Sequence, residues 1–339
     1  MSRFKSQLAS PTSTKLASLV LAPILALCGC SAIQVKLGMK VYVAQLPIAT
    51  MQASLPKDPG IAPGEKSPLV VTFTQPDGRA WMTEGAGKGK ILWSDIAITT
   101  SVVSAGKKGV LSLPRDPRLS DGKTGHVIVT VPSHPDLRAE LDIPLRYNYK
   151  FVSNFSGSSG SSGINGSDGT AGASGSTGSM DPDQPSAGGN GSDGTNGSDG
   201  QDGGAGGDAS SVDIRVTLRS APHPLLQAVV FAPGHKQRFY LVDPQGGSLT
   251  VTADGGPGGS GGKGGRGGRG GSGGIGTPNG SSGLDGTDGR NGFDGSQGRG
   301  GHITVTYDPQ VKPFLNLIRL SNRGGPPPQF NEEPVTPLW

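Results

Sequence analysis

The sequence predicts a mainly β protein in which glycine-rich tracts are inserted into a small β-sheet. Short runs of alternating apolar and polar residues recur along the chain, separated by Gly, Pro and Asp turns, and no run has a helical period. Glycine also recurs at every third position through four tracts of seven or eight triplets each. With 59 glycines and only 5% aromatic residues in 339, the apolar cores of this protein must be small.

Residues 1–29 have the composition of a signal peptide. Arg3, Lys5 and Lys15 form a basic region, and the apolar run 16–27 that follows is too short to span a bilayer with ease. Cleavage before Cys30 would leave one cysteine in the mature chain, so no disulfide within the chain is expected. The formal net charge of +4 includes the three cations of this segment, so the mature protein is predicted to be nearly neutral.

Residues 30–152 predict a β-sandwich of immunoglobulin-like kind. Their apolar runs are short, they alternate, and turn sequences such as Pro76-Asp77-Gly78 separate them. The expected strands are 34–44, 67–75, 79–83, 95–104, 109–113, 125–131 and 136–145.

A second β module is predicted in two parts, residues 212–254 and 302–321. Strands 248–253 and 302–307 look like one hairpin whose loop has been replaced by glycine-rich sequence. The remaining tail, 322–339, is rich in proline and is predicted to be flexible. The other expected strands of the module are 212–218, 225–231, 237–243 and 313–320.

The glycine-rich segments, residues 153–211 and 255–301, each contain an out-and-back pair of tracts. We name these tracts A (157–178), B (188–206), C (255–276) and D (280–301). A period of three is typical of polyproline II geometry, in which every third side chain lies along one edge. Glycine along that edge lets another backbone approach closely.

Three interpretations of the tracts are open: polyglycine II helices packed side by side, flexible linkers, or a trimeric collagen. The matched tract lengths favour the packed helices, whereas the scarcity of proline argues against collagen. Glycine is doubled in tract C, which predicts a central position with the single-glycine tracts outside it. At roughly 3.1 Å per residue, a tract would be a rod of roughly 70 Å.

The run Leu27-Cys28-Gly29-Cys30 resembles the lipobox of bacterial lipoproteins. With the glycine triplets, the chain resembles bacterial surface lipoproteins with collagen-like repeats. The resemblance implies that Cys30 is lipidated and anchors the protein in a membrane, whereas Cys28 fits poorly because Leu27 would occupy the small-residue position. If the cell is Gram-negative, Ser31 resembles an outer-membrane sorting signal, which implies an outer-membrane lipoprotein of the cell envelope on either face of that membrane; the sequence does not give the Gram type.

No catalytic residue, metal ligand or cofactor site is predicted, and the chain is not expected to be an enzyme. The histidines have no metal-ligand partner at suitable spacing, and nucleophile and phosphate-binding motifs are absent. Residues 188–193 match the start of a calcium-binding nonapeptide, but Thr195 stands where that repeat needs a large apolar residue. The aspartates of the tracts are therefore expected to be solvated. The five histidines are His126, His134, His223, His235 and His302.

Lys263, Arg266 and Arg269 are the candidate binding residues, since they recur at three-residue spacing in tract C. They resemble the Arg-Gly-Gly segments of RNA-binding proteins, but aromatic interleaving is missing and an exported chain is not expected to meet nucleic acid. The stripe could instead face Asp285, Asp288 or Asp294 of tract D, or cell-surface polysaccharide.

The predicted function is structural or adhesive: a lipid-anchored envelope protein that presents a glycine-rich helical bundle at the cell surface. Ice binding ranks lower, because flat regular rows of Thr, Ser and Asn are not evident in the sequence. The alternatives are an accessory subunit of an envelope complex, or a carbohydrate- or peptidoglycan-binding module. Aromatic side chains converging on one β face would favour the carbohydrate-binding alternative.

Overall fold

The computed structural model describes residues 31–220 and 223–339. The chain divides into two compact units, each described by itself: unit 1 (Met1–Arg115, Leu119–Arg146) and unit 2 (Asp116–Arg118, Tyr147–Trp339). Strands account for 30% of the residues and helices for 8%, so the protein is mainly β, as predicted.

Unit 1 consists of three small antiparallel sheets around one apolar core. In β8 every second residue is buried, and Val127, Val129 and Val131 pack into this core with Phe73 and Trp93. The sheet orders are β1 (Thr50–Ser54), β3 (Val70–Thr74), β4 (Ala80–Met82); β2 (Lys66–Pro68), β7 (Val110–Ser112), β6 (Ser104–Ala105); and β5 (Ala97–Ser101), β8 (Gly125–Val131), β9 (His134–Ile143).

The strand predicted at 34–44 is wrong. Its start belongs to a short helix, α2 (Ser31–Lys36), and a 3₁₀ turn lies at Val43–Gln45. Gly38 adopts a φ of 67°, a left-handed conformation that suits the residue ending a helix. Leu37 and Met39, expected on a buried face, are 68% and 58% exposed, so the alternating pattern here has no sheet to pack against.

Unit 2 is built on two sheets that lie face to face. The smaller sheet has three parallel strands in the order β10 (Lys150–Asn154), β14 (Ser248–Thr252), β16 (Ile318–Ser321). The larger sheet is mixed, in the order β13 (Arg238–Val242), β12 (Leu225–Phe231), β11 (Val212–Arg219), β15 (Ile303–Tyr307), β17 (Gln329–Glu332). Lys150–Asn154 therefore pairs with unit 2, although the predicted sandwich domain extended to residue 152.

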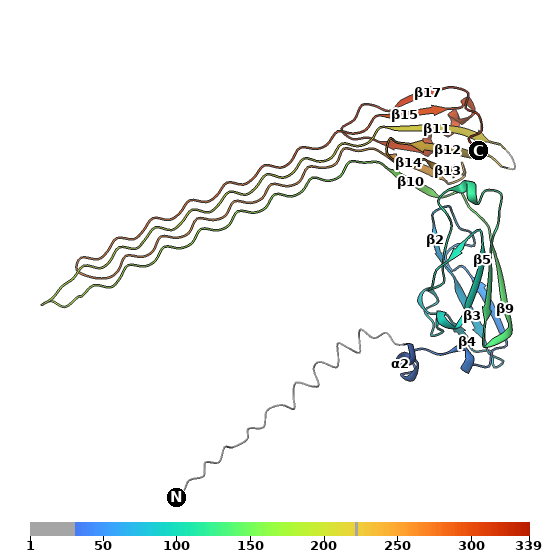
Figure 1. Cartoon of the computed structure of the whole chain (residues 1–339), viewed down its shortest axis with the longest axis horizontal. Coiled ribbons are helices and arrows are strands. Elements are labelled where there is room, and N and C mark those ends of the chain that lie inside the picture. Colours follow the sequence, from blue (N-terminus) through green and yellow to red (C-terminus); the bar gives the residue numbers. More distant parts are fainter. Residues whose placement is uncertain (1–30, 221–222) are drawn as a thin grey trace, which may run out of the picture. The chain divides into compact units, whose positions relative to one another are not determined.

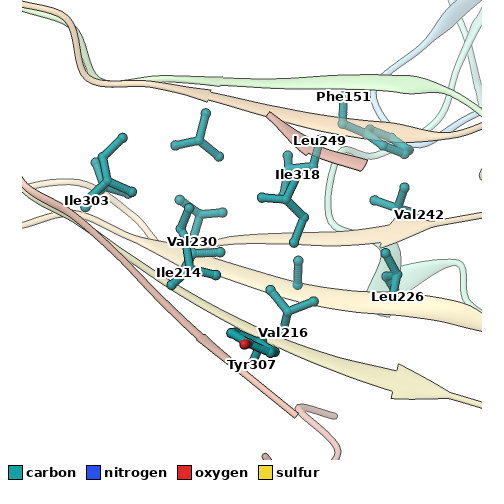
Figure 2. Close-up of a cluster of buried hydrophobic side chains, with 14 of the residues drawn as sticks. Phe151, Ile214, Val216, Leu226, Val230, Val242, Leu249, Ile303, Tyr307 and Ile318 are labelled. Atoms are coloured by element: carbon teal, nitrogen blue, oxygen red, sulfur yellow. The ribbon is translucent and has the colours of Figure 1, made fainter. Parts of the chain in front are cut away.

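The core of unit 2 lies between these two sheets. Figure 2 shows Phe151, Leu249 and Ile318 of the smaller sheet facing Ile214 and Val230 of the larger sheet. Burying these branched side chains stabilises unit 2 by about 25 cal/mol per Å² of apolar surface removed from water.

The hairpin predicted between 248–253 and 302–307 is wrong. β14 pairs with β10 and β16 in the smaller sheet, whereas β15 pairs with β11 and β17 in the larger sheet. The alternating apolar residues of both strands do face a common core, but they face it from opposite sides. A strand's pattern shows which face is buried and does not identify its partner.

The tail predicted to be flexible is attached to the larger sheet. β17 pairs with β15 in parallel. The Thr217 hydroxyl donates a hydrogen bond to the Val335 carbonyl at 3.0 Å, and the Leu338 N–H donates one to the Gln227 side chain at 3.2 Å. The strand predicted at 313–320 also differs. A 3₁₀ helix occupies Pro309–Leu317, capped by Asp308, and only Ile318–Ser321 is a strand.

The four glycine tracts continue the strands of unit 2 and run side by side (Figure 1). Tract A leaves β10 and tract B returns into β11. Tract C leaves β14 and tract D returns into β15. Each pair therefore leaves the smaller sheet and enters the larger one, so both sheets lie at the root of the bundle that the four tracts form.

Candidate functional site: the surface of the glycine-tract bundle

Backbone hydrogen bonds join each tract to its neighbours at every third residue. Amides of tract A bond to tract C, those of tract B to tracts A and D, those of tract C to tract B, and those of tract D to tract C. All these N···O distances lie between 2.7 and 2.9 Å. Tracts B and C each contact all three other tracts, whereas tracts A and D contact only two.

The doubled glycines of tract C serve two different neighbours. A Cβ at Gly264 would lie 2.1 Å from the Gly289 carbonyl oxygen of tract D, and one at Gly265 would lie 1.9 Å from the Ser167 oxygen of tract A. Both overlaps are impossible for real atoms, so tract C requires both glycines at its position. The second glycine of the pair, here Gly265, is buried.

One triplet of tract C shows how completely the backbone is satisfied. The Gly264 N–H donates to Asn291 of tract D, the Gly265 N–H to the Ser198 carbonyl of tract B, and the Arg266 N–H to Asp168 of tract A. Three consecutive amides thus bond to three different tracts. This complete hydrogen bonding of the backbone matters because the bundle has no apolar core to offset the entropy lost on ordering glycine.

Tract B holds its central position with single glycines over most of its length, which contradicts the prediction that single-glycine tracts lie outside. Its Ser and Thr residues make this possible. The hydroxyls of Ser192, Thr195 and Ser198 accept N–H groups from tract A at 2.7 Å. At these positions a Ser or Thr side chain reaches tract A through a hydrogen bond, whereas glycine would reach it through close backbone contact. Glycine is therefore not required there.

The aspartates that precede glycine are hydrogen-bond acceptors within the bundle. In tract D, Asp285 and Asp288 accept the N–H groups of Gly270 and Gly267, both at 2.7 Å. Asp193 of tract B accepts the Leu284 N–H at 2.7 Å in the same way. These carboxylates are exposed, as expected, and in addition they accept hydrogen bonds from the backbone of a neighbouring tract. Among the residues that the structure describes, no group of three or more His, Cys, Asp and Glu could hold a metal ion.

The predicted binding residues Lys263, Arg266 and Arg269 are exposed and lie along one row of tract C. A shallow hollow of about 400 Å³ is lined by Lys263 and Arg266 together with Asp288 and Asn291 of tract D. Within the described ranges, none of the three cations forms an ion pair. The neighbouring Asp288 and Asp168 accept backbone N–H groups.

The charge around these cations does not favour a polyanion. The two glycine-rich segments with Asp254 contain eleven Asp and five Lys or Arg residues, a net charge of −6, although the whole chain carries +4. The cationic row also lies beside the carboxylates of tracts A and D. An extended anionic polymer would meet more negative than positive charge along this surface.

Asp254 fixes the point where β14 passes into tract C. Its carboxylate accepts hydrogen bonds from the Ser321 hydroxyl and from the Arg323 N–H, both at 2.7 Å, and its carbonyl accepts a hydrogen bond from the Gly157 N–H. Burial acts to raise the pKa of Asp254, but the hydrogen bonds from Ser321 and Arg323 bring this pKa below its ordinary value of 3.8.

Cys30, the predicted lipidation site, falls outside the residues that the structure describes. His126 lies in β8, the central strand of its sheet, and not at a sheet edge. It is partly exposed and lies 2.7 Å from Asp142 and 3.8 Å from Glu140 on the neighbouring strand β9. Neither described range contains a helix with the length and apolar character that crossing a membrane requires. Comparisons with family models, curated proteins and solved structures gave no match to this chain.

Proposed function

We propose that the four tracts are polyglycine II helices and that their bundle is a stiff projection of a lipid-anchored envelope protein. Its role is structural or adhesive. The hydrogen bonds between tracts at every triplet, from 2.7 to 2.9 Å, carry this proposal. Linkers would have no reason to be paired in register along their whole length.

The proposal includes unit 1 as an immunoglobulin-like sandwich and assigns the protein no catalytic activity. Antiparallel strands around one core with a buried Trp93 support the sandwich. Many short polar side chains on the surface of the bundle are hydrogen-bonded to the backbone of a neighbouring tract, which supports a mechanical role. Ile164, Leu284 and Phe293 are exposed on the same bundle. At ~3.1 Å per residue, a tract reaches roughly 70 Å from the sheets at its root.

Hydrogen–deuterium exchange on the full chain in detergent tests whether the bundle is folded. We expect slow exchange of the tract amides, because each protected N–H must break a bond to another tract before it exchanges. Exchange at the unprotected rate in residues 157–206 and 255–301 would contradict the proposal and would leave the tracts as solvated linkers.

Lipid anchoring is tested by labelling cells with an alkyne-bearing fatty acid and comparing two cysteine variants. Cys30→Ser is expected to lose the label and the membrane association, since the lipobox places the acylated residue there. Cys28→Ser is the matched control and should keep both. Loss of label from Cys28→Ser alone would show that the anchor has been assigned to the wrong residue.

The role of the projection is tested by shortening it. A variant that lacks the same number of triplets from all four tracts keeps every interface and reduces only the reach. If the bundle holds a contact surface away from the membrane, cells with this variant will attach less to surfaces at equal surface abundance. Unchanged attachment together with an unchanged envelope would argue against both the adhesive and the structural role.

A further inference from the structure

The outer face of the larger sheet carries an open hollow that has no role in the proposed function of the bundle. Its volume is about 530 Å³, within the usual range for small-ligand sites. This face points away from the core shared with the smaller sheet, so its side chains are not needed for packing between the sheets. The residues that line it are Asp213, Ile214, Arg215, Val229, Phe231, Gln237, Phe239, Thr306 and Leu338.

Strand register arranges these side chains in two rows across the sheet. In one row Arg215 lies between Val229 and Thr306, with Phe239 beyond Val229. In the other row Asp213 lies between Phe231 and Thr304. Both rows therefore have aromatic rings at one end, a charged residue in the middle and hydroxyls at the other end.

The C-terminal tail forms one wall of the hollow. It covers Thr217 and Gln227 farther along the same face through hydrogen bonds to Val335, Leu338 and Trp339. The Trp339 ring meets Phe239 edge to face at 5.7 Å, and the Arg118 guanidinium lies over the Phe239 ring at 3.4 Å. Phe239 is therefore held in place, while Phe231 is 40% exposed and available for stacking.

The charges in the middle of the hollow are free to meet a ligand. Asp213 and Arg215 are both exposed, and neither side chain has a hydrogen-bond or ion-pair partner among the residues described. A carboxylate can accept two hydroxyl groups and a guanidinium can donate two parallel N–H bonds, so the pair suits a ligand dense in oxygen.

We propose that this hollow binds a carbohydrate. A pyranose ring presents an apolar face that would stack on Phe231, while its hydroxyls would bond Asp213, Arg215 and Thr306. The open, shallow face of a sheet suits a flat sugar ring better than a peptide, which would need an unpaired strand edge or a deep apolar pocket. The site depends neither on the rod nor on the anchor, so it adds a recognition function to the proposed projection.

The test begins with the full chain, purified in detergent, on an array of bacterial envelope and host glycans. Calorimetry with the best bound oligosaccharide then compares variants. Phe231→Ala and Asp213→Asn should each weaken binding by about tenfold or more, as central aromatic and charged contacts do. Asp213→Asn preserves shape at an exposed position, so it keeps the test valid if Phe231→Ala fails to fold.

Phe330→Ala is the matched control. Phe330 is 49% exposed on β17 of the same sheet, but it pairs with the inward-facing Val305 and does not line the hollow. The affinity of the Phe330→Ala variant for the oligosaccharide should stay within about twofold of that of the unchanged protein. If the protein binds a uronate-containing oligosaccharide more tightly than a neutral one, this would support binding of the sugar carboxylate by Arg215. Binding to no glycan, or binding that both Phe231→Ala and Asp213→Asn leave intact, would overturn the proposal.

Discussion

At the scale of single residues, the glycines of the tracts differ in what a side chain would meet. A Cβ at Gly203 would lie 2.1 Å from the Gly259 carbonyl oxygen, part of a fixed neighbouring backbone. A Cβ at the adjacent Gly204 would first meet the Ser161 hydroxyl at 2.7 Å, and a hydroxyl can rotate away. Adjacent glycines of one tract are therefore not equivalent.

We predict that Gly203→Ala destabilises the bundle by about 1–3 kcal/mol, the usual effect of overpacking. Gly204→Ala should stay within about 0.5 kcal/mol, because it occupies the position at which Ser192 and Ser198 are accommodated. Amide exchange of the tracts in both variants measures this difference. Equal protection in the two variants would show that close backbone contact does not hold the bundle together.

Asp254 gives the root of tract C a dependence on pH. Because its pKa in the folded protein lies below the ordinary 3.8, its contribution to stability is present at neutral pH. That contribution is lost as pH falls through the folded pKa, where the carboxylate becomes protonated. Asp254→Asn should lower the stability of unit 2 at neutral pH and should reduce the further loss seen below pH 3.8.

Chemical denaturation of both proteins at neutral and acidic pH checks this expectation. The asparagine keeps one acceptor oxygen, so a comparison with Asp254→Ala separates loss of charge from loss of the hydrogen bonds to Ser321 and Arg323. Identical acid sensitivity in the parent and in Asp254→Asn would assign the pH dependence to other carboxylates.

At the scale of elements, strands and tracts share one register. β10 and β14 pair with an offset of 98 residues, as in Phe151 with Leu249, and the same offset joins Asp168 to Arg266 in tracts A and C. β11 and β15 pair with an offset of 91, which recurs between tracts B and D, as in Asp193 with Leu284. The sheets thus set the alignment of the tracts.

This shared register predicts which length changes the bundle tolerates. Removing one triplet from each tract should preserve the register of the remaining contacts and shorten the bundle by ~9 Å, at ~3.1 Å per residue. Removing one residue from tract A alone should displace its glycines from tracts B and C and abolish amide protection in that tract. Small-angle scattering and exchange would measure the two effects. Tolerance of the single deletion would show that the triplet register is unimportant.

Particular elements show what the sequence could and could not predict. The bounds of β8 follow from alternation alone, because every second residue of this strand is buried. The pairing of β14 and β15 could not be predicted, because it depends on the tracts that continue these strands. The acceptor role of Asp288 and the hollow around Asp213 could not be predicted either, since both arise from segments brought together by folding.

At the scale of the molecule, the tail is predicted to contribute to unit 2 alone. Deleting residues 333–339 removes the partners of Thr217 and Gln227 and the ring contact of Phe239. Losses of this kind cost about 1–3 kcal/mol. Calorimetry should show a lower melting temperature for unit 2 and an unchanged one for unit 1, which contains none of these contacts. An unchanged unit 2 transition would show that the tail is dispensable.

The offset of 98 residues also bears on how the protein folds during synthesis. Tract A finds the amide acceptors of tract C only after roughly a further hundred residues have been made, and tract B depends on tract D in the same way. Contacts this distant in sequence make folding slow. Tracts A and B can bond to each other as soon as both have been made, but the bundle of four tracts can form only after tracts C and D have followed.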